Sequence, residues 1–214
     1  MPQQVRSRHR FERILEVAAQ LVVERGVDSV NTRVIAAAAG IPVASLYQYF
    51  ADKEEILLAL VERDLAEMSG QVAEDVAALD VLSVRGLVET TIRGYVQVYL
   101  RRPAFVVVWL RGRTNPVIND FCRAHNRRVA SELFEMACRT GMVLDPSNGR
   151  YAELATEVSD RLLQVAFEHR LDGDPLVIAE SITVVTNYLE THATPEGIAG
   201  VPNDRSVTRS GTRS

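Results

Sequence analysis

The sequence predicts an all-α protein made of a small N-terminal domain and a larger helical body. Apolar residues recur every three or four positions through most of the 214 residues, as they do along one face of an α-helix. No segment alternates apolar and polar residues long enough to indicate an exposed strand. The nearest exception is the β-branched run 106–108, but tryptophan and leucine follow it, and the run suits a buried helix equally well.

Residues that start and end helices mark out the N-terminal domain. An apolar stripe predicts a first helix over residues 10–25, and Gly26 suits the left-handed conformation that ends a helix. Asp52 and Glu55 form a D-x-x-E capping box, which predicts that a long fourth helix begins there and continues through Leu65.

Two shorter helices are expected between these, in the stretch TRVIAAAAGIPVASLYQYF. Asn31 can cap a helix over residues 32–39, and Gly40 tolerates the positive φ needed to end it. A third helix is expected over residues 42–49. The alanines that end the second helix let the two helices cross closely, which predicts a helix-turn-helix.

The third helix is too short to be stable alone, so it must be held by its neighbours. Ile41 and Leu46 are expected to face the core. The opposite face carries small or hydrogen-bonding side chains, namely Val43, Ala44, Ser45, Tyr47 and Gln48. Such a face fits the major groove of DNA, although an ordinary helical hairpin explains these residues equally well.

Helical periodicity continues beyond residue 65. Further helices are expected over residues 83–101, 104–112, 116–139, 149–170 and 175–192. Asn115-Pro116 and Asp174-Pro175 each place an N-cap before a proline at the first helical position. The tail is rich in Gly, Pro, Ser, Thr and Arg and is expected to be disordered. The expected domains are therefore 1–53, 54–193 and the tail 194–214.

Charge is distributed unevenly, although the formal net charge is −4. Residues 1–53 carry seven basic and five acidic side chains, whereas the remaining residues carry 17 basic and 23 acidic ones. A basic first domain on an acidic body fits a nucleic-acid module joined to a body that does not touch nucleic acid. The basic segment 6–10 is either a flexible arm on DNA or a solvated leader.

The stretch 11–58 resembles the DNA-binding domain of TetR-family transcriptional regulators. The matching residues are the Ile-Leu-x-x-Ala-Ala pattern of Ile14 to Ala19, Gly26, Asn31-Thr32-Arg33-x-Ile35-Ala36, Ala39-Gly40-Ile41, Leu46-Tyr47-x-Tyr49-Phe50 and Asp52-Lys53-Glu54-Glu55-Ile56-Leu57. This resemblance covers about a quarter of the chain and implies double-stranded DNA as a partner.

The resemblance also implies roles for individual residues. Thr32 and Arg33 would meet backbone phosphates, Tyr49 would hydrogen-bond a phosphate, and Lys53 would donate to a phosphate from the start of the fourth helix. The residues that would face the major groove are Val43, Ala44, Ser45, Tyr47 and Gln48. Phe50 would pack inside. Lys53 is the only lysine in the chain.

Two positions depart from the family pattern. Pro42 stands where the family usually has a small hydroxyl residue, and proline offers neither an amide nor a side-chain cap. Ala44 stands where glycine is common. Both departures bear on the contacts with an operator, and neither disrupts the fold.

The family architecture implies an all-helical regulatory domain and a homodimer that binds an inverted repeat. The last two long helices would form the dimer interface, and their apolar residues include Leu154, Val158, Leu162, Val165, Phe167, Ile178, Ile182, Val185 and Leu189. These stripes also fit packing within one subunit.

A small apolar or aromatic effector is expected to bind between helices of the body. The candidate ligand-binding residues are Tyr95, Tyr99, Trp109, Phe121, His125 and Phe167. His125 falls where the apolar stripe of its helix predicts a hydrophobic residue, so it fits either a pocket or a core position with a satisfied hydrogen bond.

Enzymatic functions find no support in the sequence. It has no Walker loop and no G-x-S-x-G motif, and its four histidines lack metal-ligand spacing, so we expect no enzyme activity, cofactor or metal. The two cysteines, Cys122 and Cys138, lie turns apart on one expected helix and are predicted to be reduced thiols of a cytoplasmic protein. No membrane partner is expected, since no apolar run reaches the length of a bilayer span.

Two functions follow from these observations. The first is a ligand-responsive regulator, most often a repressor in this family. The second is a DNA-binding protein whose helical body binds a protein partner instead of a small molecule.

Overall fold

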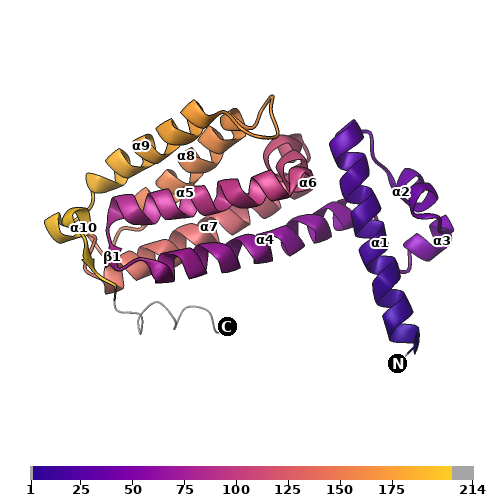
Figure 1. The fold of residues 1–214 in the computed structure, drawn as a ribbon, viewed down its shortest axis with the longest axis horizontal. Coiled ribbons are helices and arrows are strands. Elements are labelled where there is room, and N and C mark those ends of the chain that lie inside the picture. Colours follow the sequence, from indigo (N-terminus) through magenta and orange to yellow (C-terminus); the bar gives the residue numbers. More distant parts are fainter. Residues whose placement is uncertain (1, 204–214) are drawn as a thin grey trace. The chain divides into compact units, whose positions relative to one another are not determined.

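The structure is a computed structural model that describes residues 2–203, with side chains from Arg6 onward. Apart from two strands of two residues each, its regular elements are helices, so the predicted all-α class is confirmed (Figure 1). The chain forms two compact units. Unit 1 comprises the chain up to Ala66 together with Arg101–Asp120, and unit 2 comprises Glu67–Leu100 and the chain from Phe121 onward. The domain division at residues 53 and 193 stays a prediction.

Helix α1, Pro2–Arg25, supplies the apolar face expected of it and begins earlier than predicted. Its buried side chains are Ile14, Leu15, Val17, Ala18, Leu21 and Val22. Gly26 ends the helix at a φ of 76°, in the left-handed conformation predicted for it. Residues 6–10, for which a flexible arm on DNA and a solvated leader were both left open, are helical with exposed side chains, so a flexible backbone is wrong and a contact of this segment with DNA stays a prediction. Extending a formed helix backward carries no nucleation cost, and Pro2 sits in the first turn, where proline is tolerated.

The next two helices form the predicted helix-turn-helix. Helix α2, Thr32–Ala39, is capped by Asn31, whose Oδ1 accepts a hydrogen bond from the amide of Val34 at 3.0 Å. Gly40 follows at a φ of 69°. Helix α3, Val43–Leu46, is shorter than the predicted range, and turns carry the chain from it to Tyr49.

Helix α4, Lys53–Ala78, begins where the capping box predicts. Asp52 Oδ1 accepts from the amide of Glu55 at 2.8 Å. The return bond is displaced by one residue, since the Glu55 carboxylate accepts from the amide of Ala51. The helix is continuous across the boundary between unit 1 and unit 2.

The segment from Pro103 to Thr114 consists of three short helical pieces where one helix was predicted. These are α6, Pro103–Phe105, a π-helix η1, Val106–Arg111, and a 3₁₀ helix η2, Gly112–Thr114. Every residue from Ala104 to Leu110 is buried, as expected for a helix that is apolar on all sides. Within unit 1, α6 and η1 pack against α1.

Unit 2 contains the remaining long helices. They are α5, Val84–Arg101, up to Leu100, α7, Pro116–Arg139, from Phe121 onward, α8, Arg150–Ala166, and α9, Pro175–Glu190. The predicted cap of α9 is confirmed, since Asp174 Oδ1 accepts from the amides of Leu176 and Val177. Helices α8 and α9 lie side by side and pack closely against each other (Figure 1).

The prediction of disorder from residue 194 is wrong for residues 194–203. Helix α10, Pro195–Ala199, is capped by Thr194, and strand β2, Val201–Pro202, pairs antiparallel with β1, Val81–Leu82. Asn203 Nδ2 donates to the carbonyl oxygen of Leu79 at 2.8 Å. This side chain therefore caps the C-terminal end of α4. Composition alone suggests disorder, whereas Thr194 caps α10, Pro195 takes its first position, and Gly197 and Gly200 lie where a side chain would clash. A Cβ on Gly197, for example, would lie 2.6 Å from the carbonyl oxygen of Met142. The rest of the predicted tail, residues 204–214, lies outside the described residues.

Candidate nucleic-acid interface

Helix α3 and the turn after it divide their side chains sharply between core and surface. Leu46 is fully buried, as predicted, and Ile41 is half-buried. Among the five residues predicted to face the major groove, Ala44, Tyr47 and Gln48 are exposed, whereas Val43 and Ser45 are half-buried. The outer face therefore exposes the methyl group of Ala44, the Tyr47 phenol and the Gln48 amide, with Val43 and Ser45 partly exposed beside them.

A hydrogen bond joins the start of α2 to the end of the α3 turn. Thr32 Oγ1 and the Tyr47 hydroxyl lie 3.2 Å apart, and 53% of the Tyr47 surface remains exposed. Arg33 is exposed beside Thr32. The structure thus brings two of the predicted phosphate and base contacts together, although 15 residues separate them in the sequence.

Two aromatic residues follow on the same stretch of chain. Tyr49 is half-buried. Phe50 is 3% exposed and stacks on Phe11 of α1 with 5.0 Å between the ring centroids. The predicted inward packing of Phe50 is confirmed, and this contact fixes the connection between α3 and α4 to α1.

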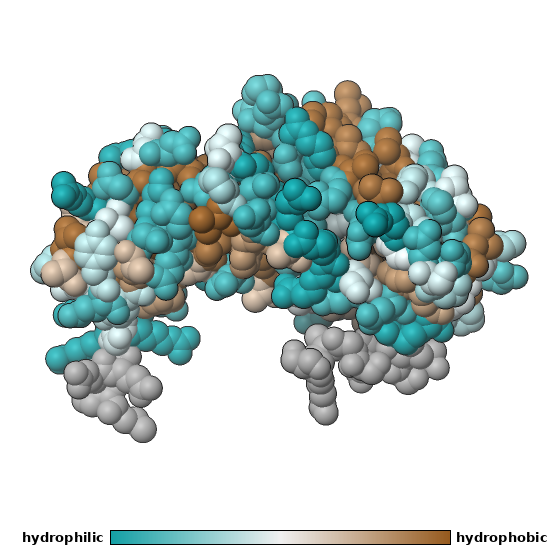
Figure 2. Space-filling model, turned by 180° about the vertical axis from the view of Figure 1, so that it is seen from behind, coloured by the Kyte–Doolittle hydropathy of each residue, from teal (hydrophilic) through white to brown (hydrophobic). Residues whose placement is uncertain are grey.

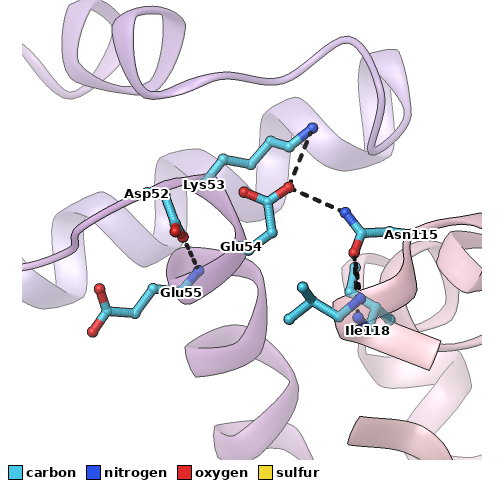
Figure 3. A network of polar contacts seen from close by, with 7 residues as sticks. Asp52, Lys53, Glu54, Glu55, Asn115 and Ile118 are labelled. Atoms are coloured by element: carbon cyan, nitrogen blue, oxygen red, sulfur yellow. Dashed lines mark hydrogen bonds and ion pairs between the residues drawn. The ribbon is translucent and has the colours of Figure 1, made fainter. Parts of the chain in front are cut away.

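Lys53 opens α4 and belongs to a small polar network (Figure 3). Its Nζ lies 3.9 Å from Glu54 Oε1. The same oxygen accepts a hydrogen bond from Asn115 Nδ2 at 3.1 Å. The sequence indicates Asn115 only as a helix cap and gives no sign of this contact, because 61 residues separate the two partners and no local pattern connects them.

Comparison with known proteins agrees with this geometry. Residues 14–60 match the family model described as "Bacterial regulatory proteins, tetR family", and residues 82–193 match the model described as "Tetracyclin repressor-like, C-terminal domain". The chain belongs to the TetR family. Members of this family are helix-turn-helix transcription regulators that bind DNA, and they are not enzymes.

Individual relatives align over most of this chain or over a part of it. The chain is 24% identical to the HTH-type transcriptional regulator BetI of Rhizobium meliloti (strain 1021), with 92% of this chain and 95% of that protein aligned. It is 32% identical to the regulator PksA of Bacillus subtilis (strain 168) over 38% of this chain and 40% of that protein. A TetR-family regulator from Streptomyces coelicolor superposes with a TM-score of 0.66 at 29% identity and covers 86% of this chain and 99% of its own.

The TetR regulatory domain is where the candidate ligand-binding residues were predicted, and the structure places most of them in unit 2. Tyr99 and Phe167 are both buried and meet edge to face with 5.3 Å between the ring centroids. Tyr95 lies 6.5 Å from Tyr99 by the same measure. Burial raises the pKa of the Tyr95 phenol above its ordinary value, with the carboxylates of Glu132 and Asp160 adding to the effect. These three aromatic residues therefore form one cluster, with an uncharged phenol.

Two of the other candidates are also placed in unit 2. His125 of α7 is buried, and its Nδ1 accepts a hydrogen bond from Arg128 Nη2 at 2.9 Å. Burial lowers the pKa of His125 to about 4, and the positive charge of Arg128 acts in the same direction, so the imidazole is neutral at pH 7. Phe121 is half-buried.

Trp109 belongs instead to unit 1. It is buried and stacks on Phe105 with 5.4 Å between the ring centroids. The guanidinium carbon of Arg113 lies 5.2 Å from the centre of its ring, and Arg113 Nε donates to the Trp109 carbonyl oxygen at 2.8 Å. The ligand pocket itself stays a prediction.

Metal-binding and membrane-spanning features are absent from the described part of the chain. Residues 2–203 contain no group of three or more His, Cys, Asp or Glu side chains placed to hold a metal ion. Among the helices described, none combines the length and the apolar character that crossing a membrane requires. Neither cysteine forms a disulfide within the described residues, and Cys122 is buried whereas Cys138 is half-buried.

The buried neutral state of His125 makes the stability of the protein depend on pH. The unfolded chain takes up a proton near the ordinary pKa of 6.5, whereas the folded chain takes it up only near pH 4. The free energy of unfolding should therefore fall as the pH drops from 6.5 to 4, by on the order of 2–3 kcal/mol from this group. Urea denaturation at several pH values measures this free energy.

His125→Phe should flatten this part of the pH profile, while His169→Asn, at an exposed histidine, should leave it unchanged. An unchanged profile in His125→Phe would contradict the assignment.

Proposed function

We propose that this regulator is a ligand-responsive repressor that acts as a homodimer on an inverted-repeat operator in the cytoplasm. The observation that carries the DNA-binding part is the outer face of the helix-turn-helix, where Tyr47 and Gln48 stand exposed. Gln48 is suited to pair with adenine, and the methyl groups of Val43 and Ala44 are suited to thymine methyl groups. Thr32, Arg33, Tyr49 and Lys53 supply the phosphate contacts.

Phosphate and base contacts predict different mutational signatures. Lys53→Ala removes one phosphate contact, so it should weaken binding to all duplexes alike and reduce the slope of log K against log salt by about 1. Gln48→Ala removes a base contact, so it should change the preferred sequence and leave that slope intact. Fluorescence anisotropy with a selected duplex and a random duplex at several salt concentrations measures both. If Gln48→Ala weakened binding to both duplexes equally, Gln48 would not read bases.

The exposed apolar residues of α8 and α9 support the homodimer. Large hydrophobic side chains in these helices have between 41% and 76% of their surface exposed, namely Leu154, Val158, Val165, Leu176 and Val184. Figure 2 shows hydrophobic surface along the upper edge of unit 2, over these two helices. Other apolar residues predicted for the interface are buried within the subunit, namely Phe167, Ile182 and Val185. We propose that the exposed set packs against its copy across a two-fold axis as a four-helix bundle.

A charge on this face should separate the subunits. Val158→Glu would bury an unpaired carboxylate in the proposed interface, so the protein should become monomeric and lose at least tenfold in affinity for its operator. Leu144→Glu is the matched control, since Leu144 is 61% exposed and lies outside both helices. Analytical ultracentrifugation measures the mass. A dimer that persisted in Val158→Glu would place the interface elsewhere.

The aromatic cluster of unit 2 supports a mainly apolar, uncharged effector. Tyr99 and Phe167 offer buried aromatic surface beside the half-buried Tyr95, while the neutral phenol of Tyr95 and the neutral His125 imidazole can orient a ligand without the cost of an unpaired charge. Release from DNA requires an effector that binds the DNA-incompetent state more tightly. Helix α4 is the proposed lever, since it begins at Lys53 and continues into unit 2.

Native mass spectrometry of the purified protein tests this part of the proposal. We expect a small, mainly apolar molecule to co-purify and to release the protein from its selected duplex. His125→Phe should then weaken that release while binding to DNA stays unchanged. A protein partner retained in place of a small molecule would favour the alternative function.

A further inference from the structure

Asn115 uses both ends of its side-chain amide. Its Oδ1 caps α7 by accepting from the amides of Val117 at 3.0 Å and Ile118 at 3.3 Å. Because that end must be the acceptor, Nδ2 points the other way and donates to Glu54 Oε1 at 3.1 Å. One residue therefore connects the start of α7 to the first turn of α4 (Figure 3).

The start of α7 is a fixed point within unit 1. Ile118, one turn after Asn115, is fully buried. Its Cδ1 lies 3.6 Å from the position that a Cβ would take on Gly112, and a methyl group of Val27 lies 3.5 Å from the same position. Asn115 is thus anchored to the packed region that follows α1, so it can restrain the carboxylate it contacts.

The carboxylate that Asn115 holds belongs to Glu54, the residue that follows Lys53. The distance of 3.9 Å between Lys53 Nζ and Glu54 Oε1 is longer than the 2.7–2.9 Å of a direct charge-assisted hydrogen bond. The oxygen nearest the ammonium is the one that Asn115 holds. If it were released, Glu54 would be free to close on Lys53, and the ammonium would then have to break that bond before it met a phosphate.

We propose that Asn115 is a positioning residue for DNA binding, which holds Glu54 away from Lys53 and keeps the lysine available to a phosphate. This inference rests on the proposed role of Lys53. It assigns the residue through which the start of α7 acts on the DNA-contacting end of α4.

The test is a double-mutant cycle on the full-length protein, with binding measured to a random-sequence duplex and to the duplex that the wild type selects from a random pool. Asn115→Ser keeps a side-chain cap but is too short to reach Glu54. It should weaken binding about three- to tenfold on both duplexes, since one charge-assisted contact to Lys53 then competes with the phosphate. In a Glu54→Gln background the same change should cost nothing, because no carboxylate is left to close on Lys53.

A second variant shows whether a loss of binding in Asn115→Ser comes from misfolding. Asn115→Asp retains the acceptor that caps α7 and places a second carboxylate beside Glu54, so it should weaken binding at least as much and be rescued by Glu54→Gln. Thr194→Ser is the matched control, since it changes another cap that precedes a proline, at the start of α10 in unit 2, and it should leave DNA binding unchanged.

The outcomes separate the inference from the proposed function. If Asn115→Ser cost the same in the wild-type and in the Glu54→Gln background, Asn115 would act only as a helix cap and the inference would be overturned. Binding of both duplexes by Asn115→Ser with wild-type affinity would overturn it as well. A wild-type protein that bound neither duplex would overturn the proposed function, and the inference with it.

Discussion

A helix of four residues cannot hold its own shape in water, so the second half of the helix-turn-helix depends on the elements around it. Helix α3 contains a single turn, for which nucleation costs more than hydrogen bonding returns. It is held instead by the burial of Leu46, by the left-handed turn at Gly40 and by the stacking of Phe50 on Phe11 just beyond it. Because the packing of its inner face holds α3 in place, the residues of its outer face are not needed for that packing and are available to contact other molecules.

In the first turn of α4, the residues that cap the helix flank residues that contact other groups. Asp52 and Glu55 cap the helix, while Lys53 and Glu54 between them point to other partners. The carboxylate of Glu54 lies between an ammonium and an amide and so connects two elements of unit 1 that are distant in sequence. In the same way, residues 101–120 all lie within the match to the C-terminal family model, yet they belong to unit 1, where α6 and η1 pack against α1. The family's boundary in sequence and the boundary in packing are therefore different.

The sequence was most informative where a local rule applies. Asn31, Asn115 and Asp174 were recognised as caps, and Gly26 and Gly40 as left-handed helix ends, because each needs only its neighbours to do so. The prediction that rested on composition alone was wrong, because composition does not show which contacts a segment makes. The Gly- and Pro-containing segment 194–203 was expected to be disordered, yet it is ordered by its fit against Met142 and by the hydrogen bonds of Asn203 to the end of α4.

Periodicity, caps and the spacing of the helix-turn-helix residues by themselves determined the helical class, the order of the long helices and the family to which the chain belongs. These properties depend on interactions within a few residues along the chain, which a sequence displays directly. Only the tertiary structure decided which apolar residues of α8 and α9 stay exposed, that Trp109 lies in unit 1 whereas Tyr99 and Phe167 meet in unit 2, and that Asn115 reaches Glu54. A residue's own helix specifies the direction of its side chain. The residues that this side chain contacts belong to another element, and a single sequence does not show directly which elements pack together.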